Sequence, residues 1–125
     1  MVPLMPPETE LVGGLELGGV PIATMVSFLT GHPAVFVRKQ AKPYGTCKIA
    51  EGPLVAGCRI TLIEDVITTG GAVRDATTAL RMEGAIVDTV VCAIDRNSTD
   101  VHPLADIAVE IRSVLTKRDL DAVRR

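Results

Sequence analysis

An apolar stretch that runs straight into two acids and a glycine-rich turn carries most of the chemical information in the sequence. Residues 60–73 read ITLIEDVITTGGAV, in which Glu64 and Asp65 precede the turn TTGG at 68–71. Glycines let successive backbone N–H groups point into one concavity, and a helix N-terminus adds unpaired donors and about half a positive charge. The threonine hydroxyls add further donors. The turn therefore predicts a cradle for a phosphate monoester.

The acid pair tells what else the site binds. Two carboxylates beside a phosphate would repel it unless they bind another group, because like charges at short range oppose one another. Sugar hydroxyls, or a metal held on them, are the natural partners, and a phosphate next to a diol indicates ribose 5-phosphate. A plain strand–turn–helix with a glycine-rich cap is the structural alternative. The order of the acids and the Thr/Gly turn favours the ribose phosphate.

Stretch 60–73 resembles the phosphoribosyl diphosphate motif of type I phosphoribosyltransferases, and further stretches narrow the family. Residues 36–52 read FVRKQAKPYGTCKIAEG. They resemble the segment of orotate phosphoribosyltransferases in which a strand ends in Arg-Lys and a further lysine opens the catalytic loop. Residues 16–23, ELGGVPIA, resemble that family's diphosphate-binding loop. Residues 94–96, IDR, resemble the strand end where the family has an arginine that contacts the pyrimidine.

This resemblance implies a role for each residue of the motifs. Glu64 and Asp65 would hold the ribose hydroxyls. Lys42 and Asp65 would be the catalytic residues. Thr68 and Arg96 would contact orotate. The positions implied for binding phosphoribosyl diphosphate are Arg38, Lys39, Lys42, Glu64, Asp65, Val66, Ile67, Thr68, Thr69, Gly70, Gly71 and Ala72. Mg²⁺ would be held mainly by diphosphate and ribose oxygens, so no protein metal ligand is assigned.

The implied reaction transfers phosphoribose from phosphoribosyl diphosphate to orotate and yields orotidine 5′-monophosphate and diphosphate, a step of UMP synthesis. Departure of diphosphate leaves positive charge on the sugar and negative charge on the leaving group, so positioning and charge stabilisation dominate. Arg38, Lys39 and Lys42 offer three cations for this purpose. Solvated, inert side chains are the alternative, which we favour for Lys48. The resemblance also implies a homodimer whose subunits share the catalytic loop.

Composition excludes several other functions. A net charge of −2 argues against a nucleic-acid-binding surface. No apolar run approaches the roughly 20 residues of a membrane span. Cys47, Cys58 and Cys92 show neither paired nor zinc-site spacing, which favours reduced thiols in a cytoplasmic protein. Apolar residues make up 47% of the chain and aromatic residues 2%, so the core must be aliphatic, as in strands beneath helices.

The predicted elements alternate between strand and helix. Strands are expected at 11–14, 34–37, 59–63, 87–94 and 107–111, helices at 20–29, from 72 to a stop at Gly84, and at 117–123, and a long mobile loop at 40–53. This alternation predicts an α/β fold, a single domain with a mostly parallel central sheet flanked by helices. Residues 1–10 are expected to be a flexible arm, and residues 11–125 the phosphoribosyltransferase domain. Ligands would bind at the carboxyl ends of the strands.

Some positions depart from the family's pattern. Its members carry an N-terminal hood over the base that supplies a lysine and aromatic residues, whereas MVPLMPPETE stands in its place here, so a fold without the hood is expected. Gly18, Pro43 and Tyr44 stand where some members have a lysine, an acid and a histidine. The site for phosphoribosyl diphosphate is therefore expected to be intact, whereas part of the site for the base is missing. Two alternatives stay open: a module that binds phosphoribosyl diphosphate or a nucleotide without turnover, and a phosphoribosyltransferase for another base.

Overall fold

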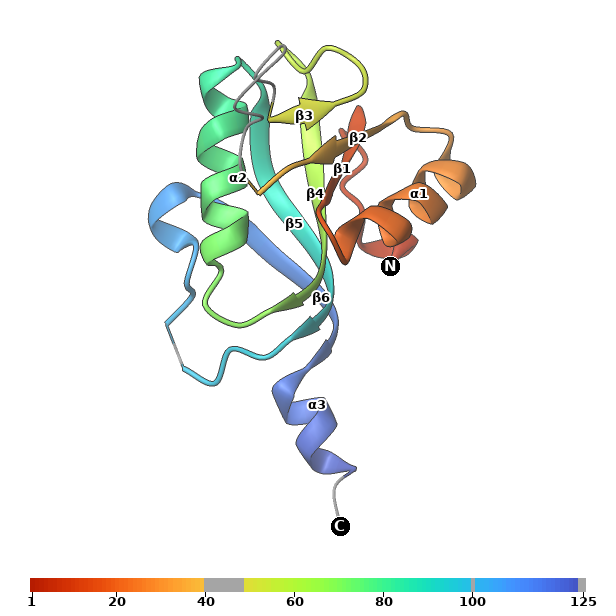
Figure 1. Ribbon diagram of the computed structural model, residues 1–125. Coiled ribbons are helices and arrows are strands. Elements are labelled where there is room, and N and C mark those ends of the chain that lie inside the picture. Colours follow the sequence, from red (N-terminus) through yellow and green to blue (C-terminus); the bar gives the residue numbers. More distant parts are fainter. Residues whose placement is uncertain (40–48, 100, 124–125) are drawn as a thin grey trace.

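The computed structural model describes residues 1–39, 49–99 and 101–123 (Figure 1). Within these ranges a six-stranded sheet has the order β3-β2-β1-β4-β5-β6. Its strands are β1 (Leu11–Leu15), β2 (Ala34–Val37), β3 (Ala50–Glu51), β4 (Arg59–Ile67), β5 (Ile86–Asp95) and β6 (Glu110–Thr116). All neighbouring strands run parallel except β2 and β3. The mostly parallel sheet predicted from the sequence is confirmed.

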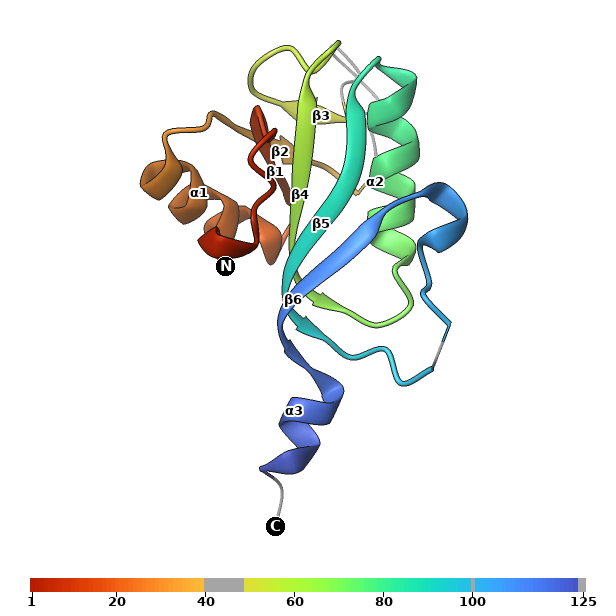
Figure 2. The ribbon, with the colours of Figure 1, turned by 180° about the vertical axis from the view of Figure 1, so that it is seen from behind.

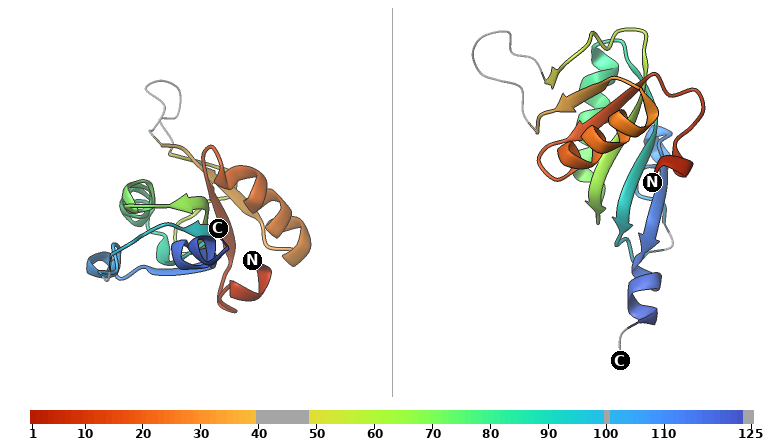
Figure 3. Two further views of the ribbon diagram at one scale, coloured as in Figure 1. Left: turned by 90° about the horizontal axis from the view of Figure 1, so that it is seen from below. Right: turned by 90° about the vertical axis from the view of Figure 1, so that its right-hand side faces the viewer.

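Two helices lie on opposite faces of this sheet. Helix α1 (Gly19–Thr30) covers one face and α2 (Gly71–Met82) the other (Figure 1). The views from below and from the side show the same layering (Figure 3). Strand β4 is buried on both faces, so consecutive Leu62 and Ile63 are both fully buried, one in each core. This explains why the strand reads as a continuous apolar run.

The chain ends in a short helix that stands away from the sheet. Helix α3 (Lys117–Ala122) follows β6 directly and extends beyond the body of the domain (Figures 1 and 2). Thr116 and Asp119 form a capping box, which satisfies the first backbone donors of the helix. The helix expected over 117–123 is therefore confirmed, and it ends at Ala122. Among the described residues, no helix is both long and apolar enough to cross a membrane.

Two predictions about the later elements need correction. The loop expected over 40–53 contains β3, whose two residues pair antiparallel with β2; residues 40–48 of that loop lie outside the described residues. So short a strand leaves no periodicity in the sequence. The strand expected over 107–111 was wrong in its bounds. A 3-10 turn, η2 (Ala105–Ile107), precedes it, and β6 instead pairs with β5 as far as Thr116.

Residues 1–10, expected to be a flexible arm, lie against the domain in the structure. A 3-10 turn, η1 (Val2–Leu4), opens the segment, and Leu4 packs on the core beneath α1. The hydroxyls of buried Thr9 and Thr61 hydrogen bond at 2.7 Å. Arg112 donates from Nη1 to the carbonyl of Leu4 at 2.9 Å. These contacts hold the segment across β4 and β6.

The strand order fixes where a ligand can bind. From β1 the chain moves outward to β2 and β3, then returns to the other side of β1 with β4. The connection after β1 runs through α1 on one face of the sheet, and the connection after β4 runs through α2 on the opposite face. In open α/β sheets, this switch point opens a crevice at the carboxyl ends of the strands. The acid pair of β4 and the loop after β1 both lie at that edge.

Candidate active site

Residues 66–73, the phosphate cradle, join the end of β4 to the first turn of α2. They line, with Glu64, a cavity of about 210 Å³. Gly70 is the N-cap of α2 and has a left-handed backbone with φ 83°, which glycine adopts without strain. Gly70 has no side chain to cap the helix, and of the first-turn N–H groups that of Gly71 makes only a long bond of 3.4 Å to Thr69 Oγ1, so this turn can offer backbone donors to a ligand. The cavity thus has the donors that a phosphate monoester needs.

The acid pair at the mouth of the cradle is electrostatically unequal. Glu64 is only 8% exposed, and burial, followed by its hydrogen bond with Asp65, raises its pKa to about 7. Exposed Asp65 has its pKa lowered by that same hydrogen bond and by the backbone N–H of Val66, which donates to Asp65 Oδ1 at 2.7 Å. At neutral pH, Asp65 is therefore the ionised acceptor, while Glu64 is partly protonated and can donate. Such a pair suits adjacent hydroxyls.

A thiol lies opposite this pair without taking part in its chemistry. Cys92 of β5 is in register with Glu64 and is fully buried. Burial, followed by the charges of Asp95 and Glu64, raises the pKa of the Cys92 thiol to about 12. It therefore stays protonated and unreactive at neutral pH.

Beside the cradle lies a second region, the diphosphate corner, made of Glu16–Gly19 with Arg38 and Lys39. A Cβ added to Gly18 would lie 2.0 Å from Asp65 Oδ2, so the loop after β1 presses directly on the acid pair. Lys39 donates its backbone N–H to Glu16 Oε1 at 2.7 Å. The positive charge of Lys39 acts to lower the pKa of both Glu64 and Asp65, so the charge lies near the acid pair.

Arg38 and the cavity beside it complete the corner. Arg38 Nη2 lies 2.7 Å from Glu51 Oε1 of β3, so this cation is already engaged by an acid. A cavity of about 340 Å³ lies between the ends of β1 and β2 and the first turns of α2. Its lining combines an apolar floor with four charged residues, namely Glu16, Arg38, Lys39 and Asp75. Lys42, expected to be catalytic, lies outside the described residues.

The two residues expected to contact the base stand next to each other. Arg96 directly follows β5, and its backbone N–H donates to the carbonyl of Ile67 at 2.7 Å. This bond places Arg96 beside Thr68, the first residue after β4. Both side chains are exposed at the same edge of the sheet. The structure therefore brings together two positions that lie in separate motifs.

Residues that the sequence did not suggest support the cradle from below. Fully buried Leu104 packs under Gly70, with its Cδ2 3.1 Å from where a Cβ would be. Arg74 of α2 forms a two-pronged ion pair with Asp106, at 2.9 and 2.8 Å, and donates to the carbonyl of Pro103 at 2.8 Å. Because Arg74 and Asp106 are 32 residues apart, no local pattern could have paired them.

Known proteins that resemble the chain decide its family. It is 73% identical to the orotate phosphoribosyltransferase of a Nocardioides species (strain JS614) over 99% of this chain and 69% of that protein. The chain belongs to the orotate phosphoribosyltransferase family. It is also 41% identical to the orotate phosphoribosyltransferase of Methanocaldococcus jannaschii over 94% of this chain and 66% of that protein. The chain thus spans about two thirds of the length of these relatives. No protein-family model matches it.

A solved structure agrees with this assignment. The Mycobacterium tuberculosis orotate phosphoribosyltransferase in complex with 5-phospho-α-D-ribosyl 1-diphosphate superposes with a TM-score of 0.75 and 34% identity, over 90% of this chain and 65% of that one. The type I phosphoribosyltransferase-like fold expected from the sequence is confirmed. The expected family and its class, pentosyltransferases of the orotate type, are confirmed as well.

Proposed function

We propose that this chain transfers 5-phosphoribose from phosphoribosyl diphosphate to orotate, giving orotidine 5′-monophosphate and diphosphate for UMP synthesis. The observation that carries the proposal is the contact between Asp65 and Gly18, which joins a ribose phosphate site to a diphosphate loop. A donor that bears a phosphate at one end of ribose and a diphosphate at the other fits these two regions. Family membership supports the same donor.

The described residues can be given roles in binding. The N–H groups at the start of α2 and the hydroxyls of Thr68 and Thr69 hold the 5-phosphate. Ionised Asp65 accepts from the ribose hydroxyls, and Glu64 exchanges a hydrogen bond with them. Asp65 therefore also stands next to the sugar as positive charge develops on it. Arg96 offers a cation to the orotate carboxylate, beside Thr68.

Breaking the C1–O bond and forming the bond from C1 to the base nitrogen leaves negative charge on diphosphate. Lys39, which lies near the acid pair, stabilises that charge. Lys42, whose role rests on the resemblance to the family, would add a second cation. Among the described residues, no group of three or more His, Cys, Asp or Glu side chains could hold a metal. We place Mg²⁺ on the donor's own diphosphate and ribose oxygens, where it would neutralise diphosphate charge.

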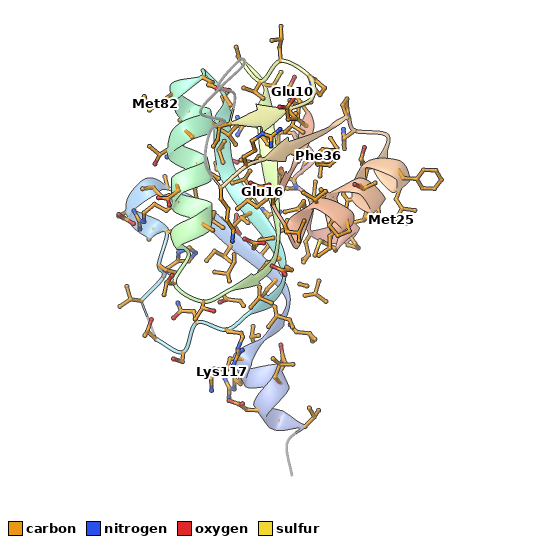
Figure 4. The ribbon with its side chains drawn as sticks, in the orientation of Figure 1. Glu10, Glu16, Met25, Phe36, Met82 and Lys117 are labelled. Atoms are coloured by element: carbon orange, nitrogen blue, oxygen red, sulfur yellow. The ribbon has the colours of Figure 1, made fainter. Side chains whose placement is uncertain are left out.

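We also propose that the enzyme is a cytoplasmic homodimer. Helix α1 contains no charged residue, yet Phe28 is 81%, Leu29 65% and Met25 57% exposed. Met25 points away from the sheet in Figure 4. Large apolar side chains that gather on an exposed and uncharged helix face mark an interaction surface, so a second copy of the chain suits this face. Light scattering after gel filtration tests the dimer. Phe28→Glu should give a monomer, whereas Met82→Glu, 84% exposed on α2, should not.

The activity itself is tested by calorimetry with phosphoribosyl diphosphate and Mg²⁺, followed by an orotate consumption assay on the same sample. Binding with turnover supports the enzyme. Binding without turnover makes the chain a module that senses the donor. Turnover with another base but not with orotate means that the acceptor is that other base. Absence of binding overturns the assignment of residues 64–72. Lys42→Ala should then slow turnover far more than it weakens donor binding, since its charge is needed mainly in the transition state.

A further inference from the structure

Glu16 is an unexpected residue for a site that binds diphosphate. It follows β1 directly and lies between the two helices, at the carboxyl edge of the sheet (Figure 4). A carboxylate this close to a polyanion opposes binding unless the carboxylate is engaged elsewhere, because like charges a few ångströms apart repel each other even in partly wet surroundings. Its side chain is half-buried and lines the larger cavity with Arg38 and Lys39. Its hydrogen bonds show what engages it.

Two hydrogen bonds join Glu16 to the end of the neighbouring strand. Its backbone N–H donates to the carbonyl of Val37 at 2.9 Å, which continues the ladder between β1 and β2. Its Oε1 accepts the backbone N–H of Lys39 at 2.7 Å. The second bond is short and involves an ionised acceptor, so it is stronger than a neutral hydrogen bond. Glu16 therefore fixes both ends of the tripeptide Val37–Lys39.

This fixation matters because the parallel ladder stops there. The last pair of residues in register is Leu15 with Val37. The N–H of Arg38 points to the other side of β2, as alternate residues of a strand do, and donates to the carbonyl of Ile49 at 2.7 Å. The N–H of Lys39 points back toward the β1 side, where the side chain of Glu16 takes over from backbone carbonyls as its acceptor. Without that carboxylate, the backbone of Lys39 would be held only through the hydrogen bond of the preceding residue, Arg38.

The position of the Lys39 backbone decides where its charge lies. Lys39 lines the larger cavity, and its charge is near enough to the acid pair to lower the pKa of both carboxyls. We propose that Glu16 is a positioning residue: by accepting the Lys39 N–H, it aims Lys39 at the diphosphate while its own carboxylate is engaged in that hydrogen bond. The inference rests on the proposed donor site. It adds a residue whose carboxylate acts through Lys39 and does not touch the donor.

Two variants separate positioning from plain electrostatics. Glu16→Gln keeps an Oε1 acceptor and removes the charge, whereas Glu16→Ala removes both. Asp75→Ala is the matched control, since Asp75 brings a carboxylate to the same cavity without a hydrogen bond to the corner among the described residues. The measurements are the KM for phosphoribosyl diphosphate, the KM for orotate, kcat, and calorimetric titration with inorganic diphosphate and Mg²⁺.

Positioning predicts that Glu16→Ala raises the KM for the donor and weakens diphosphate binding about tenfold, as expected for loss of a charge-assisted hydrogen bond. The KM for orotate should stay unchanged. Glu16→Gln should remain within about threefold of the parent, since a neutral acceptor still makes an ordinary bond. Tighter diphosphate binding in both variants overturns the inference, because Glu16 would then be a repulsive charge alone. Equal weakening for donor and orotate overturns it as well.

Amide hydrogen exchange at Lys39 gives a test that needs no ligand. Exchange at this amide should speed up in Glu16→Ala and stay slow in Glu16→Gln and in Asp75→Ala. Unchanged exchange in Glu16→Ala contradicts the inference. A parent protein that binds no donor overturns the proposed function instead, and the exchange result then still decides whether Glu16 holds Lys39.

Discussion

The phosphate cradle and the diphosphate corner, which we propose bind the two ends of one donor, are built differently. The cradle is one continuous stretch, 66–73, whose ligand groups are backbone N–H donors at the start of α2. The corner gathers Glu16–Gly19 after β1 and Arg38 and Lys39 after β2, and its ligand groups are charged side chains. The cradle is thus fixed by local backbone conformation, and the corner by long-range hydrogen bonds.

This difference has a physical consequence for binding. Backbone dipoles carry no ionisable group, so among the groups that line the cradle cavity pH acts through Glu64 and not through the N–H donors. The corner depends on side-chain charges near acids, of which the Arg38 guanidinium with Glu51 and the Lys39 charge near Glu64 and Asp65 are the described cases. Such pairs weaken as salt screens them. The donor should therefore lose affinity with salt mainly through its diphosphate end.

The largest single effect is expected at Asp65, where the two regions meet. Asp65→Asn replaces a carboxylate acceptor by a weaker amide and adds a donor next to the backbone N–H of Val66. Hydrogen bonds to charged groups contribute about 1.5–3 kcal/mol, so donor affinity should fall roughly 10- to 100-fold. Calorimetry with phosphoribosyl diphosphate and Mg²⁺ measures it, with Asp75→Asn as the control. Unchanged affinity would rule out the ribose assignment.

Glu64 should give the protein a pH-dependent stability. Its folded pKa of about 7 lies above its ordinary value of 4.5, so between these values the folded state holds a proton that the unfolded chain has released. The free energy of unfolding should therefore fall as pH rises from 4.5 to 7, by at most about 3 kcal/mol. Above pH 7 this contribution is lost.

Urea unfolding at pH 4.5, 6 and 8 measures this dependence. Glu64→Gln should flatten the profile, because the amide does not titrate. Glu8→Gln, at an exposed position in the N-terminal segment, should leave it unchanged. A parent profile that rises with pH over this window would contradict the assigned direction of the Glu64 pKa.

The same contrast explains how much of the molecule could be predicted. Every feature of the cradle, from the apolar strand to the acids and the glycine turn, lies within residues 60–73, so the sequence shows it directly. The hydrogen bond between Glu16 and Lys39 spans 23 residues, and the pairing of β3 with β2 leaves no periodicity. Contacts of this kind depend on how strands are ordered in space. The strand order could not be derived from local patterns.

Individual residues show the limit most clearly. Gly70 was expected for its backbone freedom. The structure adds a second reason for glycine here, because a side chain at this position would meet Leu104, which is distant in the sequence. Gly18 looked like a departure from the family, and in the structure it is the position whose lack of a Cβ leaves room for Asp65. In both cases the sequence identified the residue and the packing gave the reason.

A comparison of two glycines sharpens the description of the cradle. Gly70 and Gly31 both have left-handed backbones, with φ 83° and 79°, but only Gly70 meets a neighbour, Leu104, while Gly31 faces open space. Alanine at either position should cost about 1–2 kcal/mol of stability for the backbone alone. Gly70→Ala should cost more, because Leu104 must shift, and it should weaken phosphate binding. Equal losses by urea unfolding would show that the contact with Leu104 is unimportant.

The smallest effect is expected for the ion pair beneath the cradle. Arg74 and Asp106 are both exposed to solvent, and exposed pairs contribute little to stability because water screens them. Their geometry is two-pronged, however, and Arg74 also holds the carbonyl of Pro103, so the pair ties the first turn of α2 to the connection between β5 and β6. Arg74→Ala should therefore change the melting temperature little and weaken inorganic phosphate binding by a few-fold.

A double-mutant cycle with Asp106→Ala isolates the pair from the bond to Pro103. If the ion pair holds the cradle, each single variant should weaken phosphate binding, and the double variant should be no weaker than Arg74→Ala. A larger loss in Arg74→Ala than in Asp106→Ala would measure the bond to Pro103, and additive losses would mean that Arg74 and Asp106 act independently of their ion pair. No loss in any variant would leave Leu104 as the support of Gly70. The cradle would then be as local in its energetics as it is in its sequence.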